Sequence, residues 1–218
     1  MGSRASDVTR QKLLQAAFEE IYRRGFQSTS LDTILAKAGV TKGALYHYFP
    51  DKASLGYAVV EEVVKGLLLE RWGALAPSNG DPLTALQEIL RKRVASLTAR
   101  EVELGCPLHN LAQEMSPLDE QFRRRVEATF DIWIQSVADD LARGQSEGTV
   151  RKDLDPRQVA AFIVASIEGS FGLAKGAQSA PLLRSNLEVL GSFLETLRQV
   201  PTSRPVRRKP ISRRRRRA

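Results

Sequence analysis

Apolar residues recur along most of the chain at intervals of three and four, which is the spacing of one face of an amphipathic α-helix. Residues 8–25 show this spacing first, at Leu13, Leu14, Ala17, Phe18 and Ile21. It returns in eight more segments: 29–38, 42–48, 51–76, 82–103, 107–115, 117–147, 155–176 and 181–200. No segment shows the alternation that is typical of a strand. The pattern predicts an all-α fold of about nine helices.

Helix boundary signals divide the first 50 residues into three short helices. Thr29 begins the second helix with an acidic residue three positions on, and Gly39 ends it. Thr41 caps the third helix and Pro50 ends it. A tight Gly-Val turn joins these two helices, which is the helix–turn–helix arrangement of DNA-binding proteins. Proline, which needs no N–H bond at a helix start, marks four more starts: Pro107, Pro117, Pro156 and Pro181.

The third helix, 42–48, is expected to have two faces. Leu45 and Phe49 lie one turn apart and face the core, with Tyr48 partly beside them. The other face and its flank carry residues that contact phosphate or base edges, or that let a backbone approach: Thr41, Lys42, Gly43, Tyr46 and His47. The aromatic group at 46–49 has the alternative interpretation of a small packed core, and the two interpretations are compatible.

Composition narrows the class of protein. The chain has 218 residues, of which 42% are apolar, enough for a folded core. No run of about 18 apolar residues predicts a membrane span, and the N-terminus has no signal-peptide pattern, so no membrane partner is expected. The single cysteine, Cys106, allows no internal disulfide, so a cytoplasmic location is expected.

Positive charge is concentrated at the two ends of the chain. Residues 201–218 hold eight Arg and one Lys with no acidic residue. Residues 1–52 carry 8 basic and 5 acidic side chains, whereas residues 53–200 carry 16 and 20. Basic ends favour nucleic acid or another anionic surface as a partner. The arginine-rich tail is expected to be disordered, and it is either a solvated end or an auxiliary, non-specific DNA contact.

Residues 10–55 resemble the N-terminal DNA-binding domain of the TetR (tetracycline-repressor-like) family of regulators. The resemblance rests on the Gly-Phe after the first helix, the Thr-Ser cap, the Ala-Gly-Val turn and the sequence LYHYF followed by a lysine. It implies a third helix in the major groove, with DNA contacts by Thr29, Ser30, Thr41, Lys42, Tyr46, His47 and Lys52. The third helix has no Arg, Asn or Gln, so base specificity is expected to involve the second helix, DNA shape, and Lys42, Gly43, Ala44 and His47.

The resemblance also implies three regions. These are a helix–turn–helix domain at 1–52, an effector-binding and dimerisation domain at 53–200, and the tail at 201–218. TetR-like proteins pair through their last two long helices, and a homodimer contacts both halves of a palindromic operator in double-stranded DNA. Apolar stripes along these helices supply the candidate interface: Phe162, Ile163, Ile167, Phe171, Leu183, Leu187, Leu190 and Leu194. The alternative is that both stripes close the core of a single protomer.

A cavity for an unknown small-molecule effector, whose binding releases the DNA, is a further implication of the resemblance. The stretch 104–116 is similar to a segment found in one branch of the family, with Pro107 and His109 in place of smaller or apolar residues. The candidate residues for the cavity wall are Trp72, Cys106, His109, Phe130, Trp133 and Phe162. The aromatic residues among them have the alternative interpretation of core residues.

Cys106 has three interpretations: a buried structural residue, a pocket-lining residue, or an electrophile or redox sensor at a helix N-terminus, where a thiolate is favoured. One Cys and one nearby His are too few ligands for a closed zinc site. A Cys–His nucleophile pair with His109 would need an orienting third group, for which Asn110 is the obvious neighbour. The chain has no phosphate-binding glycine loop and no nucleophile elbow, so we predict no enzyme activity and no cofactor.

These features predict a homodimeric, sequence-specific transcriptional regulator, most simply a repressor that a small molecule releases from its operator. Two alternatives remain open. One is a non-specific nucleic-acid-binding protein driven by the basic tail. The other is an enzyme that uses Cys106 and His109.

Overall fold

The computed structural model describes residues 2–72 and 80–200, with side chains from Asp7 onward. Over these ranges the chain forms eleven α-helices and one π-helical segment, and no named strand. The predicted all-α fold is confirmed. The predicted arginine-rich tail, 201–218, and the end of the predicted helix 51–76 lie outside the described residues.

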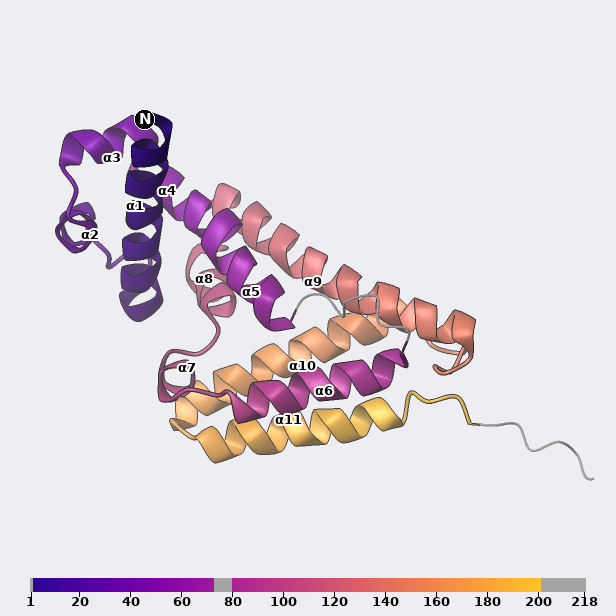
Figure 1. Cartoon of the computed structure of the whole chain (residues 1–218). Helices are drawn as coiled ribbons and strands as arrows, with labels where there is room; N and C mark the ends of the chain where they lie inside the picture. The colour runs from indigo at the N-terminus through magenta and orange to yellow at the C-terminus, as the bar shows by residue number, and fades with distance from the viewer. Residues whose placement is uncertain (1, 73–79, 201–218) are drawn as a thin grey trace, which may run out of the picture.

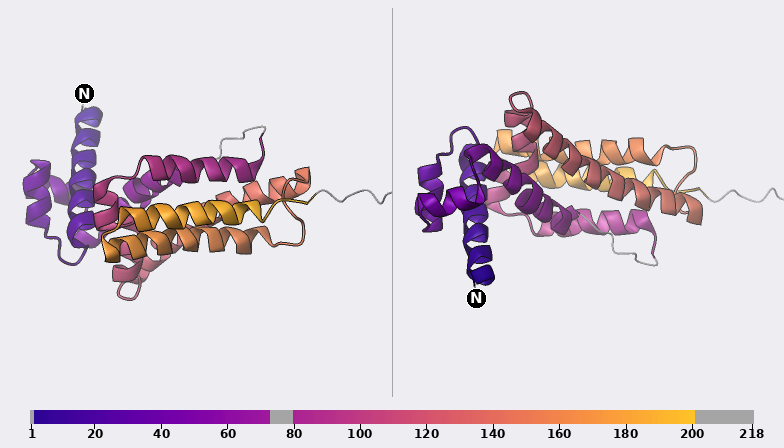
Figure 2. Two further views of the ribbon diagram at one scale, coloured as in Figure 1. Left: turned by 90° about the horizontal axis from the view of Figure 1, so that it is seen from below. Right: turned by 90° about the horizontal axis from the view of Figure 1, so that it is seen from above.

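Three helices make a separate unit at one end of the molecule: α1 (Gly2–Arg24), α2 (Leu31–Ala38) and α3 (Lys42–Tyr48). In Figure 1 this unit lies at the upper left, away from the described end of the chain near residue 200. Figure 2 shows the same unit at one tip of an elongated molecule, with α1 crossing the direction of the long helices. The N-terminal unit therefore projects from the rest of the chain.

One continuous helical stretch leads from this unit into the larger part of the protein. It begins with α4 (Lys52–Ala58), continues as the π-helical segment η1 (Val59–Val64) and ends with α5 (Lys65–Trp72). At the end of η1 the backbone N–H of Lys65 donates to the carbonyl of Val60, five residues earlier, where a regular α-helix would use the residue four earlier. This wide turn allows neighbouring valines to be buried together.

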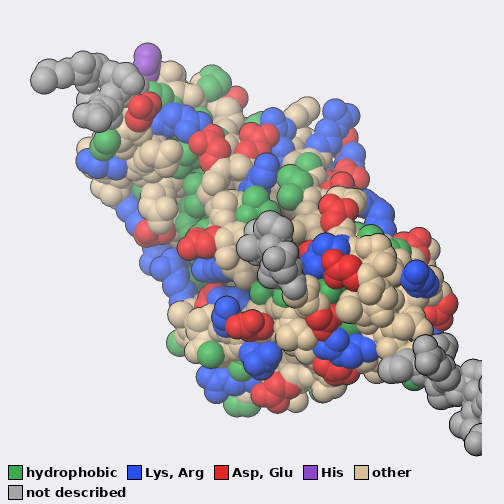
Figure 3. Space-filling view, turned by 45° about the vertical axis from the view of Figure 1, so that its right-hand side comes forward, with side chains coloured by type: hydrophobic (Ala, Val, Ile, Leu, Met, Phe, Trp, Pro, Cys, Tyr) green, Lys and Arg blue, Asp and Glu red, His purple; other side chains and the backbone are tan. Residues whose placement is uncertain are grey.

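Six helices build the larger domain: α6 (Pro82–Ala95), α7 (Ala99–Leu104), α8 (Pro107–Met115), α9 (Glu120–Glu147), α10 (Pro156–Ala177) and α11 (Ala180–Glu195). The helices α6, α10 and α11 run side by side, and α9 lies along the other side of α10 (Figures 1 and 2). On the face drawn in Figure 3, basic and acidic side chains are interspersed over this domain instead of being segregated. That distribution agrees with its nearly balanced charge.

A single hydrophobic cluster runs through both parts of the molecule. At their junction the rings of Phe26 and Phe122 meet edge to face, with centroids 4.6 Å apart. Gly56 makes room for both rings, because a Cβ placed there would lie 2.5 Å from Phe26 and 2.6 Å from Phe122. The N-terminal unit is thus packed directly against α9.

Several predicted boundaries differ from the structure, and side-chain caps explain two of these differences. The predicted helix 82–103 is two helices, because Thr98 and Glu101 form a capping box that starts α7. The predicted helix from 117 begins three residues later, because the side chain of Asp119 accepts from backbone N–H groups and caps α9. Pro117 lies in the turn before it.

By length and composition, α10 is apolar enough to cross a membrane. Its apolar residues are explained by packing, because one side of the helix is buried between α9 and α11. Core helices of folded proteins pass the same test of length and composition.

Candidate functional site

The helix α3 divides into a buried face and an exposed face. Leu45 and Phe49 are buried, and Tyr48 packs partly against the same cluster, which confirms the prediction for these three residues. The two rings between Leu45 and Tyr48, those of Tyr46 and His47, are exposed. The burial of Leu45, with α3 packed against α1, therefore fixes which side of α3 points away from the protein.

Two caps and a left-handed turn hold α2 and α3 at a fixed angle. The hydroxyl of Ser30 accepts from the N–H of Thr33 at 3.1 Å and caps α2. Gly39 then takes φ of 65°, a left-handed conformation that favours glycine. The hydroxyl of Thr41 accepts from the N–H of Ala44 at 3.2 Å and caps α3. The turn between α2 and α3 is therefore defined by two cap hydrogen bonds and one left-handed glycine, all between residues close in the sequence.

The exposed face of α3 combines a cation, an open backbone and two polar rings. The amine of Lys42 lies 6.0 Å from the centroid of the Tyr46 ring. Beside them Gly43 is open, since a Cβ placed there would meet nothing within 4 Å. The predicted DNA contacts on this side, all wholly or partly exposed, are Ser30, Thr41, Lys42, Gly43, Ala44, Tyr46 and His47.

Two other predicted DNA contacts face the protein instead. Thr29 is buried, and its hydroxyl donates to the carbonyl of Gly25 at 2.7 Å. The amine of Lys52 donates to the carbonyl of Gln27 at 3.1 Å and lies 4.7 Å from the centroid of the Phe26 ring. Burial lowers the pKa of Lys52. In this structure both residues hold the loop between α1 and α2.

A buried carboxylate joins α1 to α2. Lys37 of α2 donates to Glu20 at 3.0 Å and pairs with Glu19 at 2.8 Å. Arg23 and Arg24 also lie within 3.4 Å of Glu20. Hydrogen bonding from Lys37 is the main reason that the pKa of Glu20 is lowered. The side chain of Glu20 is 3% exposed, so three long cationic side chains cover it.

A second carboxylate ties the N-terminal unit to the larger domain. Glu114 of α8 accepts from the backbone N–H groups of Phe26 and Gln27, each at 2.8 Å. Gly25, with φ of 85°, permits this approach, because a Cβ there would lie 2.9 Å from both carboxylate oxygens. No local sequence pattern indicates this contact, which joins residues 88 positions apart.

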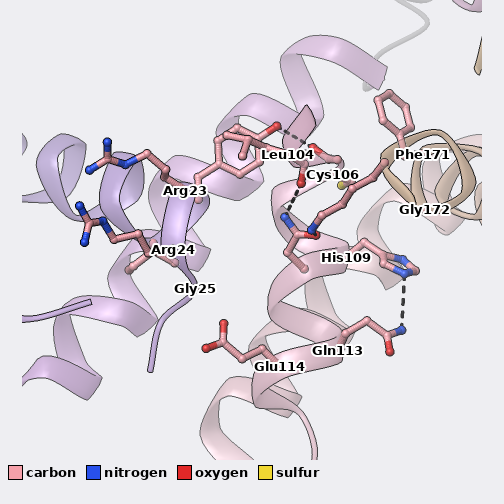
Figure 4. A pocket seen from close by; sticks show the side chains of 15 residues that line it. Arg23, Arg24, Gly25, Leu104, Cys106, His109, Gln113, Glu114, Phe171 and Gly172 are labelled. Carbon is pink, nitrogen blue, oxygen red and sulfur yellow. Dashed lines mark hydrogen bonds between the residues drawn. The ribbon is translucent and has the colours of Figure 1, made fainter. Parts of the chain in front are cut away.

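A pocket of about 570 Å³ lies beside this contact, between the end of α1 and the helices α8 and α10. Figure 4 shows its lining, with Glu114 directed toward the chain at Gly25 and with His109 and Gln113 on the other side of α8. On one wall Lys175 donates to Asn110 at 2.9 Å, and Asn110 donates to the carbonyl of Leu104 at 2.8 Å. This wall of the pocket is thus polar and hydrogen-bonded.

Tyr22 joins α1 to the rim of the pocket. Its hydroxyl donates to the carbonyl of Gly105 at 2.6 Å. Burial raises the pKa of Tyr22 to about 12, so the phenol stays protonated and keeps this bond near neutral pH. Tyr22 and Glu114 are two separate polar links between the N-terminal unit and the segment that contains α7 and α8.

A titratable cluster lies behind the pocket wall. Burial raises the pKa of Glu168 to about 7, and the neighbouring thiol of Cys106 partly offsets this rise. Nδ1 of His109 is 3.5 Å from Oε2 of Glu168. The pKa of His109 is nevertheless lowered, by burial and then by Lys175, so the close approach is not a strong ion pair. One carboxylate oxygen of Glu168 has no hydrogen-bond partner among the described residues.

Cys106 and His109, two of the candidate residues for a cavity wall, both line this pocket. Burial and the Glu168 charge raise the pKa of the Cys106 thiol well above its usual value. That direction is opposite to the lowered pKa expected for a sensor thiolate at a helix N-terminus. The structure therefore supports the interpretations of Cys106 as a structural and pocket-lining residue.

The other four predicted wall residues lie elsewhere. Trp72 and Trp133 are buried with ring centroids 5.4 Å apart, and Phe130 packs against the same core. Phe162 is exposed on α10 and contacts Phe193 of α11, with centroids 5.2 Å apart. The aromatic residues are thus core or surface residues and not pocket residues.

Most of the predicted interface residues are core residues of a single protomer. Seven are buried within one chain: Ile163, Ile167, Phe171, Leu183, Leu187, Leu190 and Leu194. They close the bundle because α9 and α6 cover the inner sides of α10 and α11. The eighth predicted residue, Phe162, is 54% exposed on the outer side, as are two residues outside the predicted set, Leu173 at 62% and Val189 at 66%.

The helices α2 and α3 form a helix–turn–helix whose second helix, α3, has an exposed polar face. A larger helical domain follows it, and this combination is that of helix–turn–helix transcriptional regulators. Residues 13–59 match the family model described as bacterial regulatory proteins, tetR family. Residues 82–188 match the tetracyclin repressor-like C-terminal domain. The chain belongs to the TetR family of transcriptional regulators.

Individual relatives agree with this assignment over most of their length. A helix–turn–helix regulator from Lactococcus lactis, encoded in the lacX 3' region and uncharacterized, is 32% identical over 86% of this chain and 93% of its own. The repressor DhaR of a Mycobacterium strain is 28% identical over 87% and 90%. The regulatory protein TetR from Rhodobacter sphaeroides is 28% identical, with a TM-score of 0.74 over 85% of this chain and 98% of that one.

Proposed function

We propose that this chain is a dimeric, sequence-specific DNA-binding regulator, and a repressor that a small-molecule effector releases from its operator. The observation that carries the proposal is the division of α3. Its apolar side chains are locked in the core, and its open, polar side faces solvent next to a fixed turn. Among the relatives, DhaR is named as a transcriptional repressor.

DNA contact is proposed for the exposed side of α2 and α3. The hydroxyls of Ser30 and Thr41, with Lys42, are residue types that bind phosphate and set the position of a helix on the duplex. The open surface at Gly43 lets a DNA strand approach closely. His47 can donate to a base edge or to phosphate. Since α3 carries no Arg, Asn or Gln to pair with a base, DNA shape supplies part of the specificity.

Pairing of two copies is proposed through the outer side of α10 and α11. Phe162, Leu173 and Val189 are exposed apolar side chains on these helices, and Phe162 already contacts Phe193 across them. Three exposed glycines of α10 leave room for a neighbouring backbone: Gly169, Gly172 and Gly176. A Cβ placed at any of them would meet nothing within 4 Å. A two-fold pair places two α3 helices on two half-sites.

The effector is proposed to bind the pocket between α1, α8 and α10. Its volume of about 570 Å³ suits a small molecule. Cys106, His109 and Lys175 offer polar contacts in its wall. The N-terminal unit can take an orientation that binds the operator and one that does not. An effector that binds the pocket more tightly in the second orientation shifts the population of molecules toward it and so away from DNA.

The test is fluorescence anisotropy of the full chain on duplex DNA from upstream of its own gene, against a scrambled duplex of equal length. A preference of about 10³ or more is expected for a site-specific regulator. Tyr46→Ala should weaken binding to the native sequence and leave the fold intact. Equal affinity for both duplexes, persisting with sites selected from random DNA, would contradict sequence-specific regulation and favour non-specific nucleic-acid binding.

The proposed pairing has its own test. Leu173→Glu places a charge on the exposed outer side of α10, where it disturbs no buried contact of the protomer. Sedimentation velocity should show a dimer for the wild-type chain and a monomer for the variant. Leu118→Glu, at an exposed position in the turn before α9, is the matched control and should leave the dimer unchanged. A wild-type monomer at micromolar concentration would contradict the pairing.

A further inference from the structure

We propose that Glu114 is the positioning residue through which the pocket controls the DNA-binding domain. This inference rests on the proposed function, since it says how occupancy of the pocket reaches the operator-binding helices. Glu114 lines the pocket, and its carboxylate also binds the first backbone groups of the loop that leads into α2. One side chain therefore belongs to both sites.

The geometry of this contact is specific. The two carboxylate oxygens accept one bond each, from the N–H of Phe26 and the N–H of Gln27. Such bonds to a charged acceptor are stronger than bonds between neutral groups. They fix both the distance and the rotation of the loop relative to α8. A single bond would fix the distance alone.

The same loop is held on its other sides by rigid contacts. The carbonyl of Gln27 accepts from Lys52 of α4, and the ring of Phe26 packs against Phe122 of α9. Thr29, two residues on, is bonded back to Gly25. A displacement of this loop is therefore carried into α2, which begins at Leu31. By the helix–turn–helix packing it also reaches α3.

The contact lies where a pocket occupant would act on it. In Figure 4, Glu114 and Gln113 extend from the same turn of α8, one toward the chain at Gly25 and the other toward His109, and both line the pocket. Because α8 has only nine residues, a ligand that presses on one side of it moves the other side as a body. The carboxylate of Glu114 then either moves the loop with it or loses its hydrogen bonds to Phe26 and Gln27.

Glu114→Gln tests the positioning role with almost no change in shape. An amide offers only one acceptor oxygen, so one of the two N–H groups loses its partner. Operator affinity should fall roughly tenfold, the size of one charge-assisted hydrogen bond expressed as an equilibrium constant. Amide hydrogen exchange at Phe26 and Gln27 should accelerate by a similar factor. Base preference should stay the same, because α3 is untouched.

Glu103→Gln is the matched control. Glu103 is an exposed carboxylate of α7, and the same loss of charge there should leave affinity and amide exchange unchanged. The operator for both measurements is a duplex selected from random DNA by the wild-type chain. Unchanged affinity in Glu114→Gln, with unchanged exchange at the two amides, would overturn the positioning role.

Coupling to the pocket is tested with a filling substitution, Gln113→Trp, alone and combined with Glu114→Gln. If Glu114 transmits the strain, the tryptophan weakens operator binding in the wild-type background and has no further effect in the Glu114→Gln background. A purely structural role for Glu114 predicts equal effects in both. Equal effects, including no effect in either, would reject the coupling.

These outcomes separate the inference from the proposed function. If the wild-type chain selects no DNA sequence, the proposed function fails. If it selects one, and Glu114→Gln behaves like Glu103→Gln, the inference fails and the proposed function stands.

Discussion

The N-terminal unit and the larger domain of this chain are both helical, but different kinds of contact determine them. In the N-terminal unit, the caps at Ser30 and Thr41 and the turn at Gly39 each depend on a hydrogen bond between residues no more than four positions apart. In the larger domain the polar contacts of the pocket join residues such as Asn110 and Lys175, which are 65 positions apart. Local contacts can be inferred from a sequence, whereas distant ones need the fold.

The largest expected effect tests whether the two faces of α3 are independent. Leu45→Ala removes a fully buried side chain and should lower the free energy of unfolding by about 2–5 kcal/mol. Its neighbour Tyr46 is 45% exposed, so Tyr46→Ala should change stability by less than about 1 kcal/mol and should weaken operator binding instead. Urea unfolding and anisotropy measure the two effects. Equal destabilisation by both substitutions would show that the face assignment is wrong.

The next effect tests a distant contact of the larger domain. Because burial raises the pKa of Glu168 to about 7, the folded chain binds the proton more tightly than the unfolded chain does. The contribution of this group to stability is therefore greatest at low pH and falls as the pH rises toward and through 7. Glu168→Gln removes that loss, so the variant should be more stable than wild type by about 3 kcal/mol at pH 8, and by less than about 1 kcal/mol at pH 5.

Urea unfolding at the two pH values measures this difference. Comparing the two chains at the same pH cancels most of the opposite contribution from His109, whose lowered pKa reduces stability as the pH falls. Glu103→Gln, on the surface of α7, should show no pH-dependent gain. A constant difference between wild type and Glu168→Gln at both pH values would mean that the buried carboxyl does not titrate as expected.

The smallest effect compares two adjacent carboxylates of α1. Both pair with Lys37, but the side chain of Glu20 is 3% exposed and that of Glu19 is 33% exposed. Glu20→Gln should cost about 1–2 kcal/mol at pH 7, and Glu19→Gln about 0–1 kcal/mol. Since the pKa of Glu20 is lowered, its contribution is present above its unfolded pKa and is lost as the pH falls through the folded value. Thermal unfolding of both variants checks the order.

The same contrast explains which residues could be predicted from the sequence. The burial of Leu45 and Phe49 follows from helical spacing within one turn, and the structure agrees. Thr98 and Glu101 also carried a local signal, a capping box, which marks the break between α6 and α7. An apolar run across this break hides that signal.

Residues whose partners are distant could not be placed in this way. The leucines of α11 have the spacing of an interface stripe, but α6 covers them, so an exposed valine on the same helix faces outward instead. Trp72 and Trp133 are of a residue type that often lines pockets, but in this fold they pack on each other. Glu114 looks like any polar residue of an amphipathic helix until the loop at Phe26 is brought beside it.

The π-helical segment η1 has a consequence for how this chain tolerates deletions. Losing one codon from a regular α-helix turns everything after it by about 100° relative to what precedes it, which moves a buried face to the surface. The ring from Val60 to Lys65 already holds one residue more than an α-helical ring. Deleting one valine within Val59–Val64 therefore leaves a regular helix in which Leu55 and Leu68 still face the core. The stretch that joins the two parts of the molecule can therefore lose one residue without turning one part against the other.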